Sequence, residues 1–319
     1  MIKRCELNPI LTAKNIPYDA DLIFNAGVIK LDGEYIMLFR NDYLKDKSVL
    51  SFSTNLGIAR SKDGINFTPD PKPCFEMSSD EILRIYDPRL QIIDGEILIC
   101  FAMDTKHGLR GGVAKTDKEF KTFEIMSLSV PDNRNMVLFP EKINGKYARL
   151  ERPFPVYSTG GDYFDIWFSD SPDLKYWGNS NLVLGAEKVP FCNTKIGPAA
   201  PPIKTSKGWL TTFHAVKEVD KKKNGWEPFW AKEYYAGIML LDLNEPYKVI
   251  GMYDKPLLAP ETLYETANGF RNNVIFPGGM ILEDNGEVKI YYGAADAVEC
   301  LATANVDDLV KLCLGEDKK

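Results

Sequence analysis

The sequence predicts an all-β fold, a five-bladed β-propeller that covers residues 1–319 as a single domain. Three observations favour this fold. A polar residue followed by Gly and an alternating apolar run recurs five times, a polar turn with an apolar residue follows each hairpin, and no long amphipathic helix is evident. The repeat measures roughly 50–80 residues, which suits a blade of about four strands.

The first half of each repeat is a hairpin signal. These signals are Asp32-Gly33, Asp94-Gly95, Asn144-Gly145, Lys207-Gly208 and Asn285-Gly286. Asp-Gly and Asn-Gly between β-branched or aromatic runs favour two-residue turns, because these residue types tolerate positive φ at both turn positions. We therefore expect a tight hairpin at each place.

The second half of each repeat is a polar turn that carries an aromatic or aliphatic plug. The turns cover residues 61–67, 116–123, 169–177 and 241–247, with a weaker example at 304–309. Turns of this kind end one strand and begin the next. A β-sandwich is the competing interpretation, and it is disfavoured because the repeating unit is a hairpin plus a plug rather than a single strand.

The composition excludes several classes of partner. The chain has 45 acidic and 39 basic side chains, and its formal net charge is −6. Without a basic stripe, a nucleic-acid partner is not expected. The lysine run at 221–223 has acidic neighbours and is interpreted as a solvated loop. No stretch approaches the ~18 apolar residues of a membrane span, so no membrane partner is expected either.

The six cysteines stand far apart and form neither a CxxC pair nor another metal-ligand spacing. Several, such as Cys100, lie in apolar runs typical of strands. The first residues lack the apolar region of a signal peptide. We therefore expect reduced core thiols in a cytoplasmic protein, with no metal site.

Charged and amide side chains interrupt apolar or Gly/Pro-rich context in nearly every repeat. Each one alone fits a structural role, such as a salt bridge, a core histidine or a turn, but their recurrence favours a shared site in the central funnel. Charges in apolar surroundings are costly unless they are paired or functional. The set comprises Arg40, Arg60, Asp87, Arg89, Arg134, Asn135, Arg152, Lys195, His214 and Asp296.

The signs of these charges favour an anion as a reactant. In this set the cations outnumber the two carboxylates, Asp87 and Asp296. A simple hydrolytic glycosidase depends on a pair of carboxylates and has no need of such an excess of cations. Phosphate suits such a site, because guanidinium forks match its oxygens and Lys adds a point charge. Phosphate is already a nucleophile, so no general base is required.

A series of motifs around these residues extends from Asn8 to Ala304. It comprises residues 24–27, 38–40, 57–64, 86–89, 133–142, 152–153, 195–197, 213–214, 234–237, 273–277 and 291–296. Together these motifs resemble glycoside hydrolase family 130, the mannoside phosphorylases. The resemblance implies a five-bladed propeller and inverting phosphorolysis of a β-mannoside, which yields α-D-mannose 1-phosphate and a shortened acceptor.

The resemblance also implies residue roles. Asp87 matches the general acid, whose proton is thought to pass through the 3-hydroxyl of the bound mannose. The positions that match phosphate ligands are Arg134, Asn135, Arg152, Lys195, His214 and Tyr234. The positions that match the mannose subsite are Asn25, Arg40, Tyr86 and Asp296. Arg60 is assigned to the same site, behind the residues that contact the sugar.

The expected reactants are a β-mannoside oligosaccharide and inorganic phosphate, which acts as a co-substrate, and no cofactor is expected. We expect burial to raise the pKa of Asp87, so that it stays protonated near neutrality. Two alternatives stay open: a β-mannosidase of the same fold that uses water, and a non-catalytic sugar-binding propeller. The linkage (β-1,2 or β-1,4), the acceptor (a manno-oligosaccharide or N-acetylglucosamine) and a homo-oligomer are also open.

The segment Lys217–Lys232 looks like an insertion relative to the family pattern. It carries Trp226, Phe229 and Trp230. Exposed aromatic rings stack on sugar faces, so one interpretation is a wall or lid on the acceptor side. The other interpretation is a surface or oligomer contact.

Overall fold

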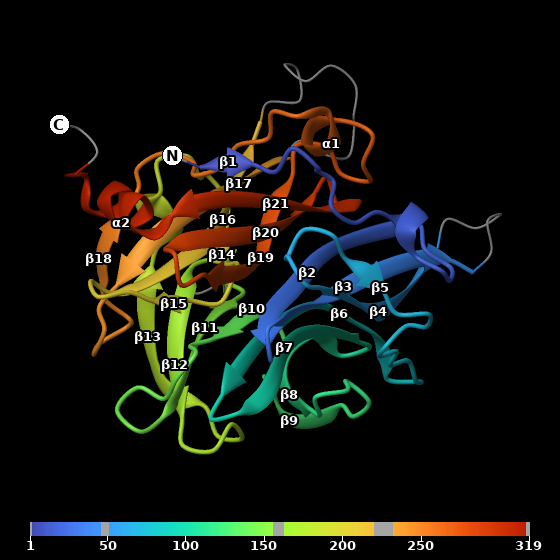
Figure 1. Cartoon of the computed structure of the whole chain (residues 1–319). Coiled ribbons are helices and arrows are strands. Elements are labelled where there is room, and N and C mark those ends of the chain that lie inside the picture. The colour runs from blue at the N-terminus through green and yellow to red at the C-terminus, as the bar shows by residue number, and fades with distance from the viewer. Residues whose placement is uncertain (1, 46–50, 156–162, 220–231, 317–319) are drawn as a thin grey trace.

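The computed structural model describes residues 2–45, 51–155, 163–219 and 232–316. Within these ranges the strands form five antiparallel sheets of four or five strands, which follow one another along the chain (Figure 1). One edge strand of each sheet, namely β2, β6, β10, β14 or β19, lies toward the centre, where β2 contacts both β6 and β19, and β10 contacts both β6 and β14. The predicted all-β, five-bladed propeller is therefore confirmed.

The first three blades run from the inner to the outer strand in simple up-and-down order. The first blade comprises β2 (Leu22–Leu31), β3 (Glu34–Leu44), β4 (Phe52–Ser61) and β5 (Thr68–Pro69). The second comprises β6 (Ile82–Ile93), β7 (Glu96–Thr105), β8 (Gly108–Thr116) and β9 (Glu124–Leu128). The third comprises β10 (Asn133–Leu138), β11 (Tyr147–Pro153), β12 (Ile166–Ser171) and β13 (Gly178–Leu184).

The last two blades depart from this order. The fourth comprises β14 (Lys195–Pro198), β15 (Ile203–Lys204), β16 (Trp209–Glu218), β17 (Lys232–Leu241) and β18 (Val249–Met252), and both β14 and β15 pair with β16. The fifth comprises β19 (Ile275–Leu282), β20 (Glu287–Ala294), β21 (Val298–Asn305) and the N-terminal β1 (Lys3–Arg4).

The ring is closed by the N-terminal strand, which the sequence did not reveal. β1 pairs with β21, so both ends of the chain build one sheet (Figure 1). Arg4 ties this strand down: its Nε donates to Glu265 Oε1 at 2.8 Å, and its Nη2 donates to the Ala259 carbonyl at 2.7 Å. Glu265 is fully buried. The charge of the buried Glu265 carboxylate is therefore balanced by Arg4 of the N-terminal strand.

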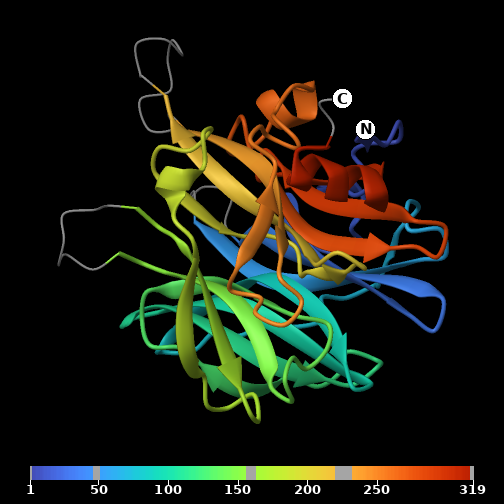
Figure 2. The ribbon, with the colours of Figure 1, turned by 90° about the vertical axis from the view of Figure 1, so that its left-hand side faces the viewer.

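Helices are few and short in the described ranges. They are η1 (Ala13–Asn15), η2 (Ala186–Lys188), α1 (Leu263–Thr266) and α2 (Val306–Leu314). α2 packs against β17, β18 and β21, and it lies near β1 in both views (Figures 1 and 2). In the described part of the chain, no helix is long and apolar enough to cross a membrane.

Three of the five predicted hairpin turns have both residues at positive φ. Asp32-Gly33, Asp94-Gly95 and Asn144-Gly145 adopt φ values of 50° to 52° at the first residue and 78° to 80° at the glycine. The prediction is wrong at Asn285-Gly286, where only the glycine is left-handed, because a wider turn ends with Gly286 donating to the Glu283 carbonyl. At Lys207-Gly208 the predicted hairpin forms, with Ile203 opposite Leu210 and Lys204 opposite Trp209, although neither turn residue has positive φ.

The plugs of the first three blades are buried as predicted, through Phe67, Phe120 and Leu174. The prediction of a fifth polar turn at residues 304–309 is wrong, since this segment contains the start of α2. Asn305 caps that helix by accepting a hydrogen bond from the Asp307 backbone nitrogen at 2.9 Å. An Asn at the N-cap with Asp307 and Asp308 in the first turn favours a helix N-terminus as strongly as it favours a turn.

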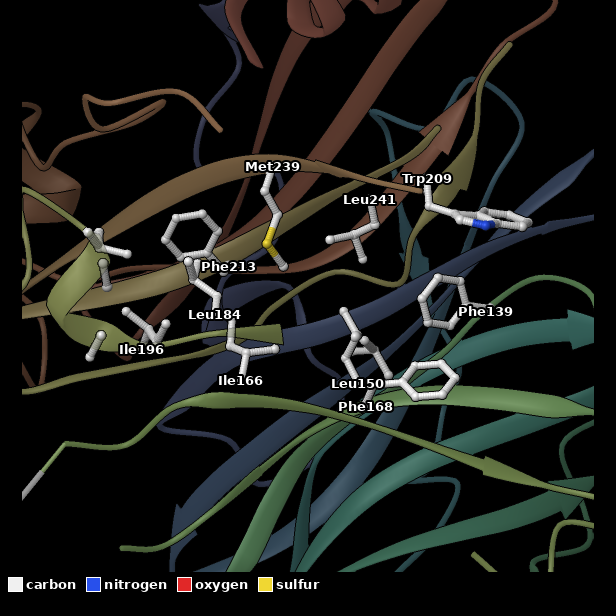
Figure 3. Close-up of a cluster of buried hydrophobic side chains, with 14 of the residues drawn as sticks. Phe139, Leu150, Ile166, Phe168, Leu184, Ile196, Trp209, Phe213, Met239 and Leu241 are labelled. Atoms are coloured by element: carbon white, nitrogen blue, oxygen red, sulfur yellow. The ribbon is translucent and has the colours of Figure 1, made fainter. Parts of the chain in front are cut away.

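The apolar core lies between neighbouring blades. One cluster joins the third and fourth blades, with Phe139 and Leu150 from one side and Trp209 and Phe213 from the other (Figure 3). Phe139 and Trp209 meet edge to face with ring centroids 5.4 Å apart. The Trp209 ring nitrogen donates to the Leu243 carbonyl at 3.1 Å, so its burial leaves no unpaired polar group.

Three inner strands carry a β-bulge at an equivalent place. The pairing register shifts within residues 24–27, 86–89 and 134–137. Each bulge contains one residue with left-handed backbone: Asn25, Asp87 and Asn135, with φ values of 55°, 51° and 59°. A bulge redirects the side chain of its extra residue. These three bulges therefore belong to the region where the polar site is formed.

Candidate active site

Eleven of the twelve predicted site residues line one pocket. It has a cavity volume of about 190 Å³, which is small for a ligand site and suits compact polar reactants. All five blades contribute to its lining: Asn25, Arg40, Arg84, Tyr86, Asp87, Arg134, Asn135, Arg152, Lys195, His214, Tyr234, Arg271, Val274, Phe276 and Asp296. Six of these side chains are Arg or Lys and two are carboxylates. The predicted excess of cations therefore holds for the pocket.

Arg60 does not reach this pocket, and its assignment to the substrate site is corrected. It pairs with Ile36 across the β3–β4 ladder, four positions from Arg40. At about 3.3 Å per residue, Arg60 therefore lies ~13 Å from Arg40, measured along the direction of the strands. Its guanidinium instead lies 3.6 Å from Glu34 Oε2 and 3.8 Å from Asp70 Oδ1. Arg60 is therefore a surface ion-pair residue.

The carboxylate of Asp87 is held by neighbours from the first blade. Asn25 Nδ2 donates to Asp87 Oδ1 at 3.0 Å, and Arg40 Nη1 approaches the same oxygen at 3.3 Å. Burial raises the pKa of Asp87, but Arg40, Arg89 and the Asn25 amide outweigh it and bring the pKa below its usual range. The expectation of a raised pKa is therefore wrong for the free protein, because donors to the charged form win over desolvation.

Arg40 is fixed on every side. Its Nε and Nη2 donate to the two oxygens of Asp42 at 2.9 and 2.6 Å, and its guanidinium lies 4.5 Å from the Phe24 ring centroid and 4.9 Å from that of Tyr86. Thr54 Oγ1 in turn donates to Asp42 Oδ1 at 2.7 Å. Arg40 thus presents a fixed positive charge to Asp87.

Four basic side chains crowd the opposite part of the pocket. Arg152 and His214 are buried, and Arg152 Nη1 lies 3.0 Å from His214 Nε2. Burial and mutual repulsion lower the pKa of Arg152 to about 9 and that of Lys195 to about 6, and they hold the pKa of His214 well below its usual value. Arg134 keeps a raised pKa, because Tyr86 and Asp87 offset its burial. Burial and repulsion within the cluster therefore favour the neutral forms of Lys195 and His214.

Several donors of this cluster have no partner among the described residues. They are Nε of Arg134, Nε of Arg152 and Nδ1 of His214. All three side chains line the pocket, and each of these nitrogens can donate a hydrogen bond. Gly197 makes room for His214, because a Cβ at this glycine would lie 2.4 Å from His214 Cε1.

The second carboxylate, Asp296, lies on the fifth blade. Its backbone is left-handed, with φ at 50°, and Arg271 Nη1 lies 3.3 Å from its Oδ2. Burial raises the pKa of Asp296 to about 6, while Arg271 and Arg40 oppose this shift. The two carboxylates of the pocket therefore differ: the pKa of Asp87 is lowered and that of Asp296 is raised.

Sequence reasoning missed four lining residues: Arg84, Arg271, Val274 and Phe276. Arg84 is two residues before Tyr86 on the same strand, so the period of two would have found it. Phe276 lies in a recognised motif, and its ring centroid is 4.6 Å from that of His214. Arg271 carries no local signal, because a loop outside the repeat brings it to the pocket.

Two expectations fall outside the described residues. The lysine run Lys221–Lys223 and the aromatic side chains Trp226, Phe229 and Trp230 lie in the range 220–231. Of the proposed insertion, residues 217–219 and 232 are described. Among the residues that the structure describes, no group of three or more His, Cys, Asp or Glu side chains is placed to hold a metal ion.

Comparisons with known proteins agree with this geometry. The family model described as beta-1,4-mannooligosaccharide phosphorylase matches residues 2–314. A beta-1,4-mannooligosaccharide phosphorylase of Ruminococcus albus is 36% identical over 97% of this chain and 90% of that protein. A 1,2-beta-oligomannan phosphorylase of Thermoanaerobacter sp. is 32% identical over 97% of this chain and 98% of that protein.

A solved structure supports the same relationship. The beta-1,2-mannobiose phosphorylase from Listeria innocua, in complex with beta-1,2-mannobiose, matches with a TM-score of 0.82 at 28% identity and covers 98% of this chain and 99% of that one. Because the family model and these relatives extend over nearly the whole sequence, this protein belongs to glycoside hydrolase family 130, the family of the mannoside phosphorylases.

Proposed function

We propose that this protein is an inverting phosphorylase that cleaves β-mannosides with inorganic phosphate and releases α-D-mannose 1-phosphate. The observation that carries the proposal is the composition of the pocket, in which six cationic side chains face two carboxylates. Such a site favours a phosphate nucleophile over a water molecule activated by a carboxylate base. The relatives named above are phosphorylases of β-1,4- and β-1,2-linked mannosides, which supports the same reaction.

In the proposed reaction, phosphate is held by Arg134, Arg152 and Lys195, with Asn135, His214 and Tyr234 as further ligands. The mannose unit lies against Asn25, Arg40, Tyr86 and Asp296. A phosphate oxygen bonds to C1 as the bond from C1 to the acceptor oxygen breaks, and Asp87 supplies the proton to that oxygen through the sugar. No proton is consumed overall, because hydrogen phosphate loses the one that the released acceptor gains.

Asp87 must be protonated when the bond breaks, although donors keep its pKa low in the free protein. Phosphate resolves this conflict. Arg134 is among the cations that lower the pKa of Asp87, and a bound dianion offsets its field. Substrate also excludes water from the pocket. Both changes raise the pKa of Asp87, so binding prepares the acid.

The proposed reaction is compatible with more than one mannosidic linkage and more than one acceptor. The relatives include both β-1,2- and β-1,4-specific phosphorylases, and β-1,2-mannosides, β-1,4-mannosides and mannosyl-N-acetylglucosamine are all candidate substrates. The proposed reaction uses no cofactor. All six cysteines lie among the described residues and are free, which supports the cytoplasm as the proposed compartment. A homo-oligomer stays a prediction.

The deciding experiment incubates the purified protein with β-1,2- and β-1,4-mannobiose, with and without phosphate. We expect mannose 1-phosphate only when phosphate is present. Free mannose at the same rate without phosphate would establish a hydrolase, and sugar binding by calorimetry without turnover would establish a binding protein. The reverse reaction, with α-mannose 1-phosphate and a panel of acceptors, then identifies the linkage by NMR of the product.

A further inference from the structure

A chain of hydrogen bonds connects the rim of the second blade to Arg134. Asp104 is the last residue but one of β7 and lies opposite Arg84 of β6. The Tyr86 hydroxyl donates to Asp104 Oδ1 at 2.8 Å, and Arg134 Nη1 donates to the Tyr86 hydroxyl oxygen at 3.2 Å. Arg84 Nε donates to the other carboxylate oxygen of Asp104 at 2.7 Å.

The direction of this chain is determined by chemistry. An ionised carboxylate only accepts hydrogen bonds, and a phenol has one proton to donate. Burial raises the pKa of Tyr86, so the hydroxyl stays protonated. With that proton directed to Asp104, the lone pairs of the hydroxyl oxygen face the guanidinium of Arg134. Without Asp104, the hydroxyl is free to rotate and no longer presents an oriented acceptor.

We propose that Asp104 is a positioning residue that acts through the Tyr86 hydroxyl to orient Arg134 toward phosphate. This inference rests on the proposed function and deepens it. It separates two parts of Tyr86: the ring lies against Arg40 in the mannose subsite, whereas the hydroxyl serves the phosphate side. Asp104 itself is absent from the pocket lining, so it acts only through its neighbours.

Stability does not account for this arrangement. The side chains of Asp104 and Arg84 are 24% and 34% exposed. Ion pairs that are partly accessible to solvent contribute only modestly to folding. Substitution of Asp104 is therefore expected to leave the protein folded, and its effect is expected in the use of phosphate.

The test is a double-mutant cycle with Asp104→Ala, Tyr86→Phe and the double variant. Initial rates are measured with inorganic phosphate and with the β-mannobiose that the wild type cleaves. Removal of a hydrogen bond to a charged group predicts a rise of roughly ten- to a hundredfold in the KM for phosphate, with the KM for mannobiose within twofold. Asp104→Asn, which keeps an acceptor oxygen, should restore most of the phosphate affinity. The double variant should equal Tyr86→Phe alone, because Asp104 acts through that hydroxyl.

A matched control is Asp170→Asn, which removes a carboxylate that pairs with Lys146 away from the pocket and should change neither KM. An unchanged phosphate KM in Asp104→Ala, or additive effects in the double variant, would overturn the inference while wild-type turnover left the proposed function intact. If the wild type shows no phosphorolysis, both fall. If Asp104→Ala does not fold, Tyr86→Phe decides, since a wild-type phosphate KM in that variant also refutes the chain.

Discussion

Asn25 and Asp87 come from neighbouring blades and meet side chain to side chain, with Nδ2 of Asn25 donating to Oδ1 of Asp87 at 3.0 Å. Both residues have left-handed backbone at a β-bulge of an inner strand. Such backbone is uncommon outside glycine and costs energy, and it recurs where function requires it. The contact thus links the proposed acid to the proposed mannose subsite through two locally strained bulges.

The substitution Asp87→Asn tests the proposed acid. It keeps the shape of the side chain and removes the transferable proton, so the phosphorolysis rate should fall by about 10²–10⁴-fold. Circular dichroism and the thermal midpoint should show a folded protein. The matched control is Asp42→Asn, which alters the support of Arg40 rather than the acid and should leave measurable turnover. Near-normal rates in Asp87→Asn would remove Asp87 from the mechanism.

Arg152→Lys tests whether phosphate needs the guanidinium fork. Lys keeps a positive charge but has no planar pair of donors. Its side chain is also shorter than that of Arg and cannot reproduce the contact with His214. We expect the kcat/KM for phosphate to fall by about 10–100-fold. The KM for mannoside should change little. An equal loss for both reactants would indicate general damage to the pocket rather than a phosphate ligand.

Lys195 is expected to destabilise the unliganded protein in a pH-dependent manner. Burial and neighbouring arginines lower its pKa to about 6, whereas the unfolded chain holds its proton up to its ordinary value near 10.5. Between these values the unfolded state binds more protons, so the free energy of unfolding rises with pH. Lys195→Met should therefore stabilise the protein by about 1–4 kcal/mol near pH 6. The gain should fade toward pH 10.

Urea denaturation at pH 6, 7.5 and 9 measures this difference between the wild type and Lys195→Met. Phosphate provides the functional counterpart: it should raise the thermal midpoint of the wild type and have much less effect on the variant. A gain in stability that does not depend on pH would show that Lys195 keeps an ordinary pKa.

The closure of the ring predicts a large effect of a terminal residue. Arg4→Ala leaves the buried carboxylate of Glu265 without its ion-pair partner, although Tyr292 still donates to it at 2.9 Å. Loss of one partner of a buried pair costs about 3–5 kcal/mol. The remaining donors, which are the Tyr292 hydroxyl and the backbone nitrogens of Glu261 and Thr262, should keep the loss near the lower limit. The control is Lys146→Ala, an exposed partner of Asp170, which should cost less than about 1 kcal/mol. Equal losses in the two variants would contradict a structural role for Arg4.

Local sequence patterns predicted the blades, because a two-residue hairpin turn depends on the backbone preferences of its own residues and a buried plug on an apolar residue within a polar turn. Asp32-Gly33 and Asp94-Gly95 behave as local preference requires, since little else constrains an exposed two-residue turn. The ten charged or amide positions that interrupt apolar or Gly/Pro-rich context were also evident. Eight of them reach one pocket, since the propeller brings corresponding parts of the repeats toward its axis.

Four features of the protein depend on tertiary contacts. Ring closure by β1 and the arrival of Arg271 at the pocket depend on contacts between residues distant in the chain, which leave no local pattern. The separation of Arg60 from the site depends on its position along a ladder rather than on residue type. The low pKa of Asp87 depends on Arg40 and Asn25 of another blade, because the charge state of a buried group is determined by the sum of desolvation and its neighbours in space.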